Sequence, residues 1–170
     1  MIDLNPHIRD VPDFPKPGIV FKDITPLLAD GPAFRATVDA LVEPYRGRCD
    51  LVLGVESRGF IVGAAAAYAL GTGLAVVRKP GKLPYRTHRA TYDLEYGTDT
   101  LEIHLDGLGT HRRVLLIDDL LATGGTASAA IELVKRCGGD VVGCAFVIEL
   151  GFLDGRKRLG DHEVHSLLKY

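Results

Sequence analysis

Four runs of consecutive apolar residues constrain the fold of this chain more than any other feature. They occupy residues 51–55, 74–77, 114–117 and 141–148. Successive side chains of a strand point to opposite faces of a sheet, so a strand that is apolar throughout is buried on both faces. Because segments of helical spacing separate these runs, right-handed βαβ units are expected. The sequence therefore predicts an α/β fold with a single twisted parallel sheet and helices on both faces.

The expected helices have recognisable starts and ends. Asp30 is a favourable N-cap for a helix that Pro44 ends or kinks near Glu43. A second helix is expected over about residues 59–70. A third helix opens after a loop of small residues at 122–126 and is stopped by the glycine pair that begins at Gly138.

Two stretches lack a regular pattern. Residues 11–26 are rich in proline, which removes backbone donors, and are expected to be irregular. Residues 78–100 form a long polar stretch, and stretches of this kind inside a compact domain are usually functional or mobile. Apolar and polar residues alternate over 101–105, which predicts a half-exposed strand with Glu102 among its polar positions. Residues 163–168 are expected to add an edge strand.

Composition and charge exclude several classes of protein. The chain has 170 residues, 46% hydrophobic and 25% charged, which is usual for one globular domain. A net charge of -2 argues against non-specific nucleic-acid binding, which needs clustered positive charge. Residues 60–77 carry no charge, but glycines interrupt them, so a buried helix and strand fit better than a membrane span. Residues 1–170 are therefore expected to form a single domain with neither nucleic acid nor a membrane as partner.

Two features indicate a cytoplasmic protein. Residues 1–6 hold an acid and a proline where a signal peptide would need a basic start and an apolar run. The three cysteines, Cys49, Cys137 and Cys144, have no CxxC spacing. Reduced thiols in the cytoplasm are the simplest interpretation of that pattern.

The segment from residue 114 to 126 carries the strongest functional signal. A buried strand leads to two adjacent acids, Asp118 and Asp119, and then to a loop of small and hydroxyl residues that opens a helix. Ligands gather at the carboxyl ends of strands in open α/β sheets. The loop amides, the hydroxyls of Thr123 and Thr126 and the helix N-terminus form an anion site. A phosphate site beside two acids that suit a vicinal diol describes a ribose 5-phosphate.

Other interpretations of this segment are weaker. The plainest is a helix N-cap followed by two solvated acids. The GxxxxGK[ST] pattern of nucleotide-binding P-loops and the GxGxxG pattern of dinucleotide folds are both missing from the sequence. The histidines are scattered without HxxxH or HxH spacing, so no protein metal site is expected.

The same segment resembles the phosphoribosyl-pyrophosphate (PRPP) signature of the type I phosphoribosyltransferases. Five further blocks, from about residue 9 to the C-terminus, match the branch of that family that acts on adenine. They are residues 14–26, 56–60, 78–84, 92–97 and 149–150. The resemblance implies a Rossmann-like core of that family, with a small hood from residues 1–30. It also implies transfer of the 5-phosphoribosyl group of PRPP to adenine, giving AMP and pyrophosphate.

The resemblance implies a role for each block. Glu95 would handle a proton on the purine imidazole ring. Phe21 and Leu150 would stack on the two faces of adenine. Backbone groups of Val20 and Lys22 would read its edge, so a Lys or Arg side chain at position 22 is expected to matter little. The residues expected to bind PRPP and AMP are Asp118, Asp119, Ala122, Thr123, Gly124, Gly125, Thr126, Ser57, Arg58, Arg78, Lys79, Lys82 and Tyr96.

Three more properties follow from the resemblance. The peptide between Glu56 and Ser57 is expected to be strained or cis. Mg²⁺ is expected to be bound through the oxygens of PRPP or pyrophosphate and through water, because it prefers phosphates and water to an all-protein cage. A homodimer is expected, in which some basic side chains of residues 78–82 reach the neighbouring subunit's site.

Two other functions stay open at this point. The same transfer to hypoxanthine, guanine or xanthine would use the same PRPP site, and the choice of base rests on the resemblance. A PRPP-sensing regulator without catalysis would also keep the site. Such regulators carry a nucleic-acid domain or a basic surface, for which 170 residues with a net charge of -2 leave little room.

Overall fold

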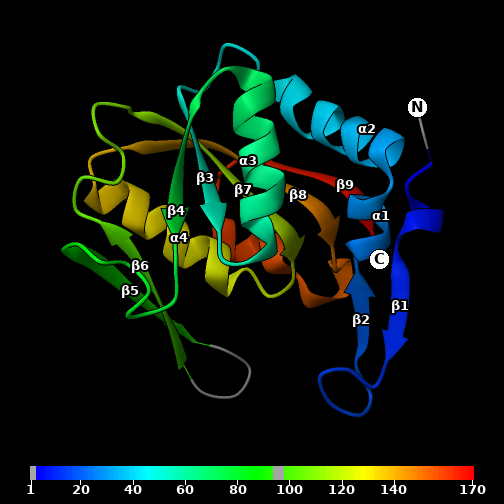
Figure 1. Cartoon of the computed structure of the whole chain (residues 1–170). Helices are drawn as coiled ribbons and strands as arrows, with labels where there is room; N and C mark the ends of the chain where they lie inside the picture. Colours follow the sequence, from blue (N-terminus) through cyan, green and yellow to red (C-terminus); the bar gives the residue numbers. More distant parts are fainter. Residues whose placement is uncertain (1–2, 94–97) are drawn as a thin grey trace.

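The computed structural model describes residues 3–93 and 98–170. Its middle layer is a sheet of five parallel strands in the order β4-β3-β7-β8-β9 (Figure 1). These strands are β3 (Leu51–Val55), β4 (Gly73–Val77), β7 (Arg113–Leu121), β8 (Asp140–Glu149) and β9 (Val164–Lys169). The predicted parallel sheet is therefore confirmed, and the tail forms its edge strand β9.

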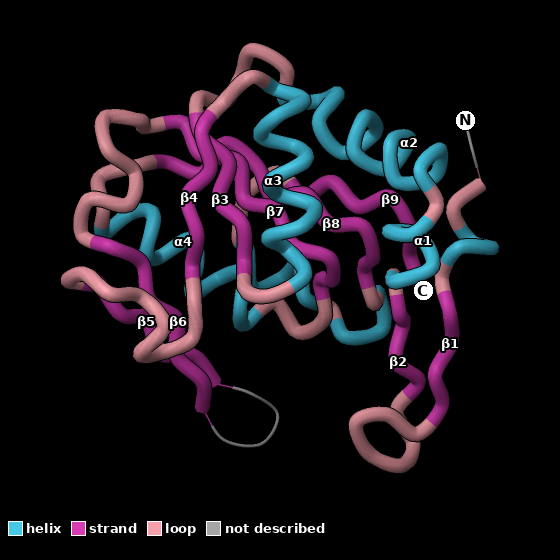
Figure 2. The backbone as a smooth tube through the Cα atoms, in the orientation of Figure 1, coloured by secondary structure: helices cyan, strands magenta, loops and turns pink. Residues whose placement is uncertain are grey.

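Helices cover both faces of this sheet (Figure 2). The longer ones are α2 (Gly31–Val42), α3 (Arg58–Leu70) and α4 (Gly125–Arg136). One core cluster joins the sheet to α2 and α3, and the other joins it to α4. Within the described residues, none of the helices combines the length and apolarity that crossing a bilayer requires. The uncharged stretch at 60–77 is α3 followed by β4, as predicted, but neither is buried throughout, since Ile61, Tyr68 and Leu74 are 47%, 91% and 39% exposed.

Local chemistry explains where these helices begin and end. The Asp30 carboxylate accepts a hydrogen bond from the Ala33 amide at 2.9 Å, which caps α2. Gly71 adopts a left-handed conformation, with φ of 68°, and ends α3. The remaining short helices are α1 (Thr25–Ala29), η1 (Asn5–His7), η2 (Glu43–Tyr45), η3 (Gly151–Leu153) and η4 (Gly155–Leu159).

Both stretches that were expected to be irregular contain an antiparallel hairpin. Strands β1 (Arg9–Pro12) and β2 (Val20–Asp23) form the first, and β5 (Thr87–Asp93) and β6 (Thr98–His104) form the second. These predictions were wrong because each strand is defined by its cross-strand partner rather than by its own periodicity. Prolines occupy the end of β1 and the turn that follows it, where no ladder donor is lost.

The strand predicted over residues 101–105 is confirmed as part of β6, but it is not half-exposed as expected. Leu101 and Ile103 are buried as expected, but Glu102 between them is only 2% exposed. Its carboxylate accepts a hydrogen bond from the Gly81 amide at 3.1 Å and lies 2.6 Å from Arg89 Nε. The segment that begins at Arg78 therefore covers the face of β6 that the sequence pattern assigned to solvent.

The two hairpins extend past the carboxyl end of the sheet from opposite sides (Figure 1). The β5–β6 hairpin packs beside α4, and the β1–β2 hairpin lies near the C-terminal end of the chain. The carboxyl ends of the strands therefore lie between the two hairpins.

Candidate active site

The site centres on the end of β7. This strand places Asp118 and Asp119 at the carboxyl edge, and the chain then turns through residues 122–124 into α4. A hollow of about 190 Å³ is lined by Arg58 and by residues 118–127. The predicted strand, acid pair and loop therefore enclose one small cavity at the helix N-terminus, where backbone amides and the helix dipole favour an anion.

Close packing of two glycines shapes this loop. Gly124 has a φ of 80°, a conformation that side-chain-bearing residues rarely adopt. A Cβ added to Gly124 would overlap the carbonyl oxygen of Gly155, and one added to Gly155 would overlap the carbonyl oxygen of Ala122. Gly155, the first residue of η4, therefore packs directly against the backbone of residues 122–124. Sequence reasoning missed Gly155, because nothing about it indicates contact with residues thirty positions earlier.

The two acids have different surroundings. The Asp119 side chain is 10% exposed and forms an ion pair with Arg58 through Nε. Asp118 Oδ1 accepts a hydrogen bond from the Asp119 amide at 2.9 Å. Burial, and then the neighbouring charge of Asp119, raise the pKa of Asp118. A ligand hydroxyl that donates to these carboxylates would replace the solvation that burial removes.

Arg58 connects the acid pair to the N-terminal hairpin. Its guanidinium carbon lies 4.9 Å from the centre of the Phe21 ring, which also makes an edge contact with Phe14 at 5.1 Å. Arg58 follows the Glu56–Ser57 peptide, which is cis as the resemblance implied. One side chain therefore touches both the predicted ribose site and the predicted base site.

Glu56 holds the first part of the basic loop. Arg78 Nε and Nη2 each lie 3.3 Å from a Glu56 carboxylate oxygen, and the Lys79 amide donates to the same carboxylate at 2.9 Å. Burial acts to raise the pKa of Glu56, but these contacts outweigh it and lower the pKa. Arg78 also donates to the Lys82 carbonyl oxygen at 3.2 Å. Glu56 thus fixes a loop whose cations were predicted to meet pyrophosphate.

A polar network joins the second hairpin to the start of α4. Lys79 Nζ forms an ion pair with Asp99 and lies 3.4 Å from the Tyr92 hydroxyl. That hydroxyl also lies 3.2 Å from Thr126 Oγ1. Asp99 was missed by sequence reasoning, because a lone acid in a polar stretch carries no signal. The network places β5 and β6 directly over the helix N-terminus.

The residues predicted to bind the base lie on two separate elements. Val20, Phe21 and Lys22 belong to β2, whereas Leu150 follows β8 and its amide donates to the Leu121 carbonyl oxygen at 2.9 Å. The Lys22 side chain is only 14% exposed and bonds to Asp10 at 2.6 Å. The Lys22 side chain is therefore held against β1 by a contact across the hairpin.

Two predicted site residues, Glu95 and Tyr96, lie outside the described residues.

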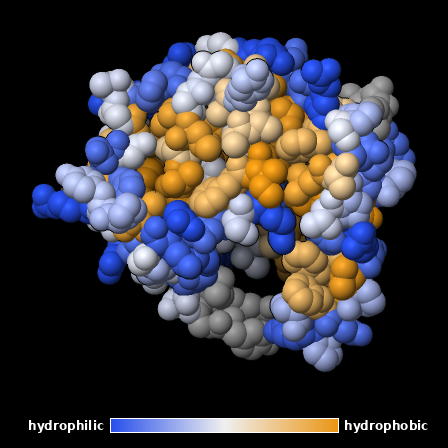
Figure 3. Space-filling view, viewed as in Figure 1, coloured by the Kyte–Doolittle hydropathy of each residue, from blue (hydrophilic) through white to orange (hydrophobic). Residues whose placement is uncertain are grey.

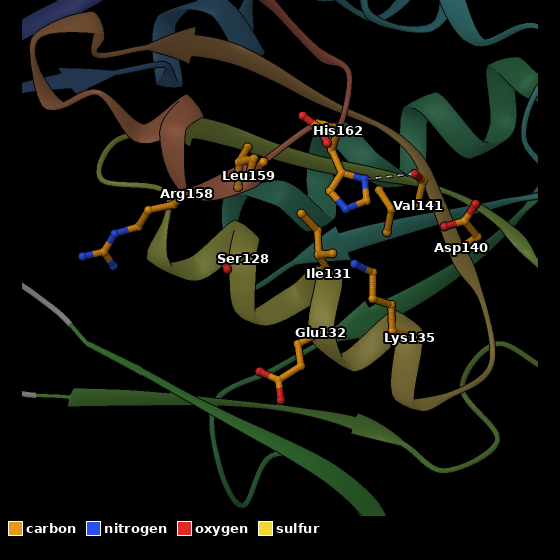
Figure 4. A pocket seen from close by; sticks show the side chains of 11 residues that line it. Ser128, Ile131, Glu132, Lys135, Asp140, Val141, Arg158, Leu159 and His162 are labelled. Carbon is orange, nitrogen blue, oxygen red and sulfur yellow. Dashed lines mark hydrogen bonds between the residues drawn. The ribbon is translucent and has the colours of Figure 1, made fainter.

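A larger hollow, of about 610 Å³, lies between α4 and the segment that follows η4 (Figure 4). Its floor includes Ile131 and Leu159, and His162 Nδ1 lies 3.3 Å from the Val141 carbonyl oxygen at its edge. None of the predicted site residues that the structure describes lines this second hollow, so the candidate site is placed at the end of β7.

Comparisons with known proteins agree with this geometry. The family model of the phosphoribosyl transferase domain matches residues 28–166. The adenine phosphoribosyltransferase of Syntrophotalea carbinolica is 61% identical over 171 residues, which is 100% of each chain. The crystal structure of that enzyme from Rhodothermus marinus has a TM-score of 0.94 and 54% identity, and covers 98% of this chain and 96% of its own. The Saccharomyces cerevisiae enzyme, in complex with an imino-altritol bisphosphate and adenine, has a TM-score of 0.91 and 40% identity, with coverages of 97% and 96%.

Proposed function

The chain belongs to the phosphoribosyltransferase family, and we propose that the cavity at the end of β7 is where it binds PRPP. The full-length likeness to adenine phosphoribosyltransferases makes it an enzyme of that activity. It transfers the 5-phosphoribosyl group of PRPP to adenine and yields AMP and pyrophosphate. The observation that carries the placement is the acid pair beside a loop of small residues at a helix N-terminus.

The proposed pose of PRPP follows the polar groups of the site. The amides of residues 122–126 bind the 5-phosphate, as expected at a helix N-terminus. Asp118 and Asp119 accept hydrogen bonds from the ribose hydroxyls. The pyrophosphate meets the cationic side of the site, because guanidinium and ammonium groups suit phosphate oxygens. The groups proposed there are Ser57, Arg58, Arg78, Lys79 and Lys82.

The reaction exchanges one bond at the anomeric carbon for another. A purine ring nitrogen forms a bond to that carbon while the bond to pyrophosphate breaks, and the proton of the ring nitrogen passes to Glu95. Positive charge develops on the ribose, as in glycoside chemistry. The β5–β6 hairpin, already tied to Thr126 through Tyr92, is proposed to exclude water that would compete as the nucleophile.

We propose that adenine lies between Phe21 and Leu150. Backbone groups of Val20 and Lys22 read its edge, and a carbonyl oxygen accepts from the 6-amino group. A 6-oxopurine would place its own acceptor against that carbonyl. An unpaired polar group of this kind can lower kcat/KM for the substrate by up to ~10⁴-fold. Product formation from adenine, hypoxanthine, guanine and xanthine, each with PRPP and Mg²⁺, tests this placement. Equal use of hypoxanthine and adenine would contradict it.

Magnesium fits this site as a partner of the substrate. Among residues 3–93 and 98–170, no cluster of three or more metal-ligating side chains is found. Asp118 and Asp119 are acids beside the proposed diol, and can orient water on a cation that PRPP carries. When bound, Mg²⁺ neutralises the charge of the pyrophosphate leaving group.

Changing Asp119 to Asn is expected to raise the KM for PRPP by about 10- to 100-fold, because hydrogen bonds to a charged group contribute about 1.5–3 kcal/mol. The KM for adenine should change little, since Asp119 lies on the ribose side of Arg58. Asp140→Asn, at an exposed position at the start of β8, is the matched control. Steady-state kinetics with each substrate varied in turn measures the effect, and an unchanged KM for PRPP would count against the diol role.

A homodimer is also part of the proposal. Apolar side chains gather over α3 and β4 (Figure 3), where Tyr68 is 91%, Ile61 47% and Leu74 39% exposed. Apolar patches of this kind on soluble domains usually mark interaction sites, and this one adjoins the strand that leads to the basic loop. A second copy of the chain would cover it.

The double variant Ile61→Asp/Tyr68→Asp is expected to be monomeric in sedimentation velocity, because two carboxylates at the centre of the patch would lose water on association. Leu105→Asp, at a 37% exposed residue outside the patch, should leave the dimer intact. A dimer that survives the double change would show that the interface lies on another face.

The hood and the cellular location complete the proposal. Residues 1–30, which include the β1–β2 hairpin and Phe21, contribute the hood over the base. A cytoplasmic location fits the free thiols of Cys49, Cys137 and Cys144, of which Cys49 and Cys144 are buried.

A further inference from the structure

Tyr170 touches both elements that form the proposed adenine pocket. It follows β9, whose final residues pair with the end of β8. Its backbone and its side chain make separate contacts, to opposite walls. Neither the sequence blocks nor the proposed chemistry assigns it any role.

The backbone of Tyr170 holds the wall that carries Leu150. Its amide donates to the Glu149 carbonyl oxygen at 3.0 Å, and its own carbonyl oxygen accepts from the Gly151 amide at 2.8 Å. Leu150, between these two residues, is tied to β7 by its own amide. The main chain of this wall is therefore fixed on both sides.

The side chain of Tyr170 reaches the opposite wall. Lys22 Nζ lies 3.9 Å from the centre of the Tyr170 ring, which is the geometry of a cation–π contact. The Tyr170 hydroxyl donates to Asn5 Oδ1 at 3.2 Å. Lys22 is the residue after Phe21, and its ammonium group is also bonded to Asp10 across the hairpin. The ring of Tyr170 therefore contacts the hairpin at the strand that carries Phe21.

We propose that Tyr170 is a positioning residue that sets the separation between the two walls of the adenine pocket. The inference rests on the proposed placement of adenine between Phe21 and Leu150. A planar base gains the stacking energy of both walls only when both of its faces are in van der Waals contact, and a wall that moves away by a fraction of an ångström forfeits part of that contact. A hairpin is marginally stable by itself, so its position depends on such tertiary contacts.

The test is kinetic and uses two matched variants. In Tyr170→Ala the contact to Lys22 is lost while the backbone hydrogen bonds remain, and the KM for adenine is expected to rise about three- to tenfold. Tyr170→Phe keeps the ring over Lys22 and should restore a KM close to that of the unmodified enzyme. In both variants the KM for PRPP and kcat at saturating substrates should be unchanged.

Several results would overturn the proposal. One is an unchanged KM for adenine in Tyr170→Ala. Another is an equal rise in the KM for adenine and the KM for PRPP, because equal rises indicate a general loss of structure. Phe21→Ala serves as the reference. If it raises the KM for adenine and Tyr170→Ala does not, only the role of Tyr170 fails. If Phe21→Ala has no effect, the placement of adenine fails and the role of Tyr170 fails with it.

Discussion

Replacing Glu95 with Gln is expected to lower kcat by about 10²- to 10⁴-fold, the usual contribution of a positioned acid or base. Glutamine keeps the length and the hydrogen-bonding oxygen of the side chain but does not take up the proton that the purine nitrogen releases. The KM for PRPP should change by less than threefold or so, since the acid–base role concerns the base rather than the phosphates.

Steady-state and single-turnover kinetics separate the chemical step from product release in this variant. Glu132→Gln, at an exposed position on α4, is the matched control and should retain full activity. A Glu95→Gln enzyme with normal single-turnover rates would remove Glu95 from proton transfer. A variant with normal kcat but weaker PRPP binding would instead make Glu95 a residue that positions the phosphates.

Changing Gly155 to Ala is expected to lower kcat/KM for PRPP by about 10²-fold, because a shift of about 1 Å at a reacting centre can have an effect of that size. The added methyl group would overlap the Ala122 carbonyl oxygen, and it would lie 3.1 Å from the Gly124 amide nitrogen. One of the two backbone segments has to move. Leu159 is 2% exposed under α4, and Arg156 holds Glu149 at 2.6 and 2.7 Å, so η4 is the firmer of the two.

The phosphate loop should therefore be the segment that yields in Gly155→Ala. Overpacking of this kind usually lowers stability by about 1–3 kcal/mol, which a thermal melt would detect. Calorimetric titration with PRPP measures the lost affinity directly. Gly31→Ala, where nothing lies within 4 Å of the added atom, is the matched control. Unchanged affinity for PRPP together with a lower melting temperature would mean that η4 moves instead and that the loop tolerates it.

The amino-acid sequence predicted the parts of this protein that depend on local pattern. Uninterrupted apolar runs identified β3, β4, β7 and β8, although β4 lies at an edge of the sheet and leaves Leu74 39% exposed. Asp30 and Pro44 marked the limits of α2 because capping and a missing amide act within one turn. The run from Asp118 to Thr126 also predicted the cavity at the end of β7, because the strand end, acids, small residues and helix start are contiguous.

The parts that the sequence missed depend on residues that meet only after folding. The hairpins β1–β2 and β5–β6 formed where prolines and polar residues suggested irregular chain, because pairing partners rather than periodicity define them. Glu102 is buried although polar and apolar residues alternate along its strand.

By itself, then, the sequence determined the sheet, the helices and the loop at the start of α4, since these follow from chain-local hydrophobicity and backbone conformation. Tertiary structure alone decided that Gly155 supports that loop, that Glu56 fixes the basic segment and that Tyr170 contacts both β2 and the chain that follows β8. The physical reason is that these contacts depend on distances between segments far apart in the chain, which no spacing along the sequence encodes.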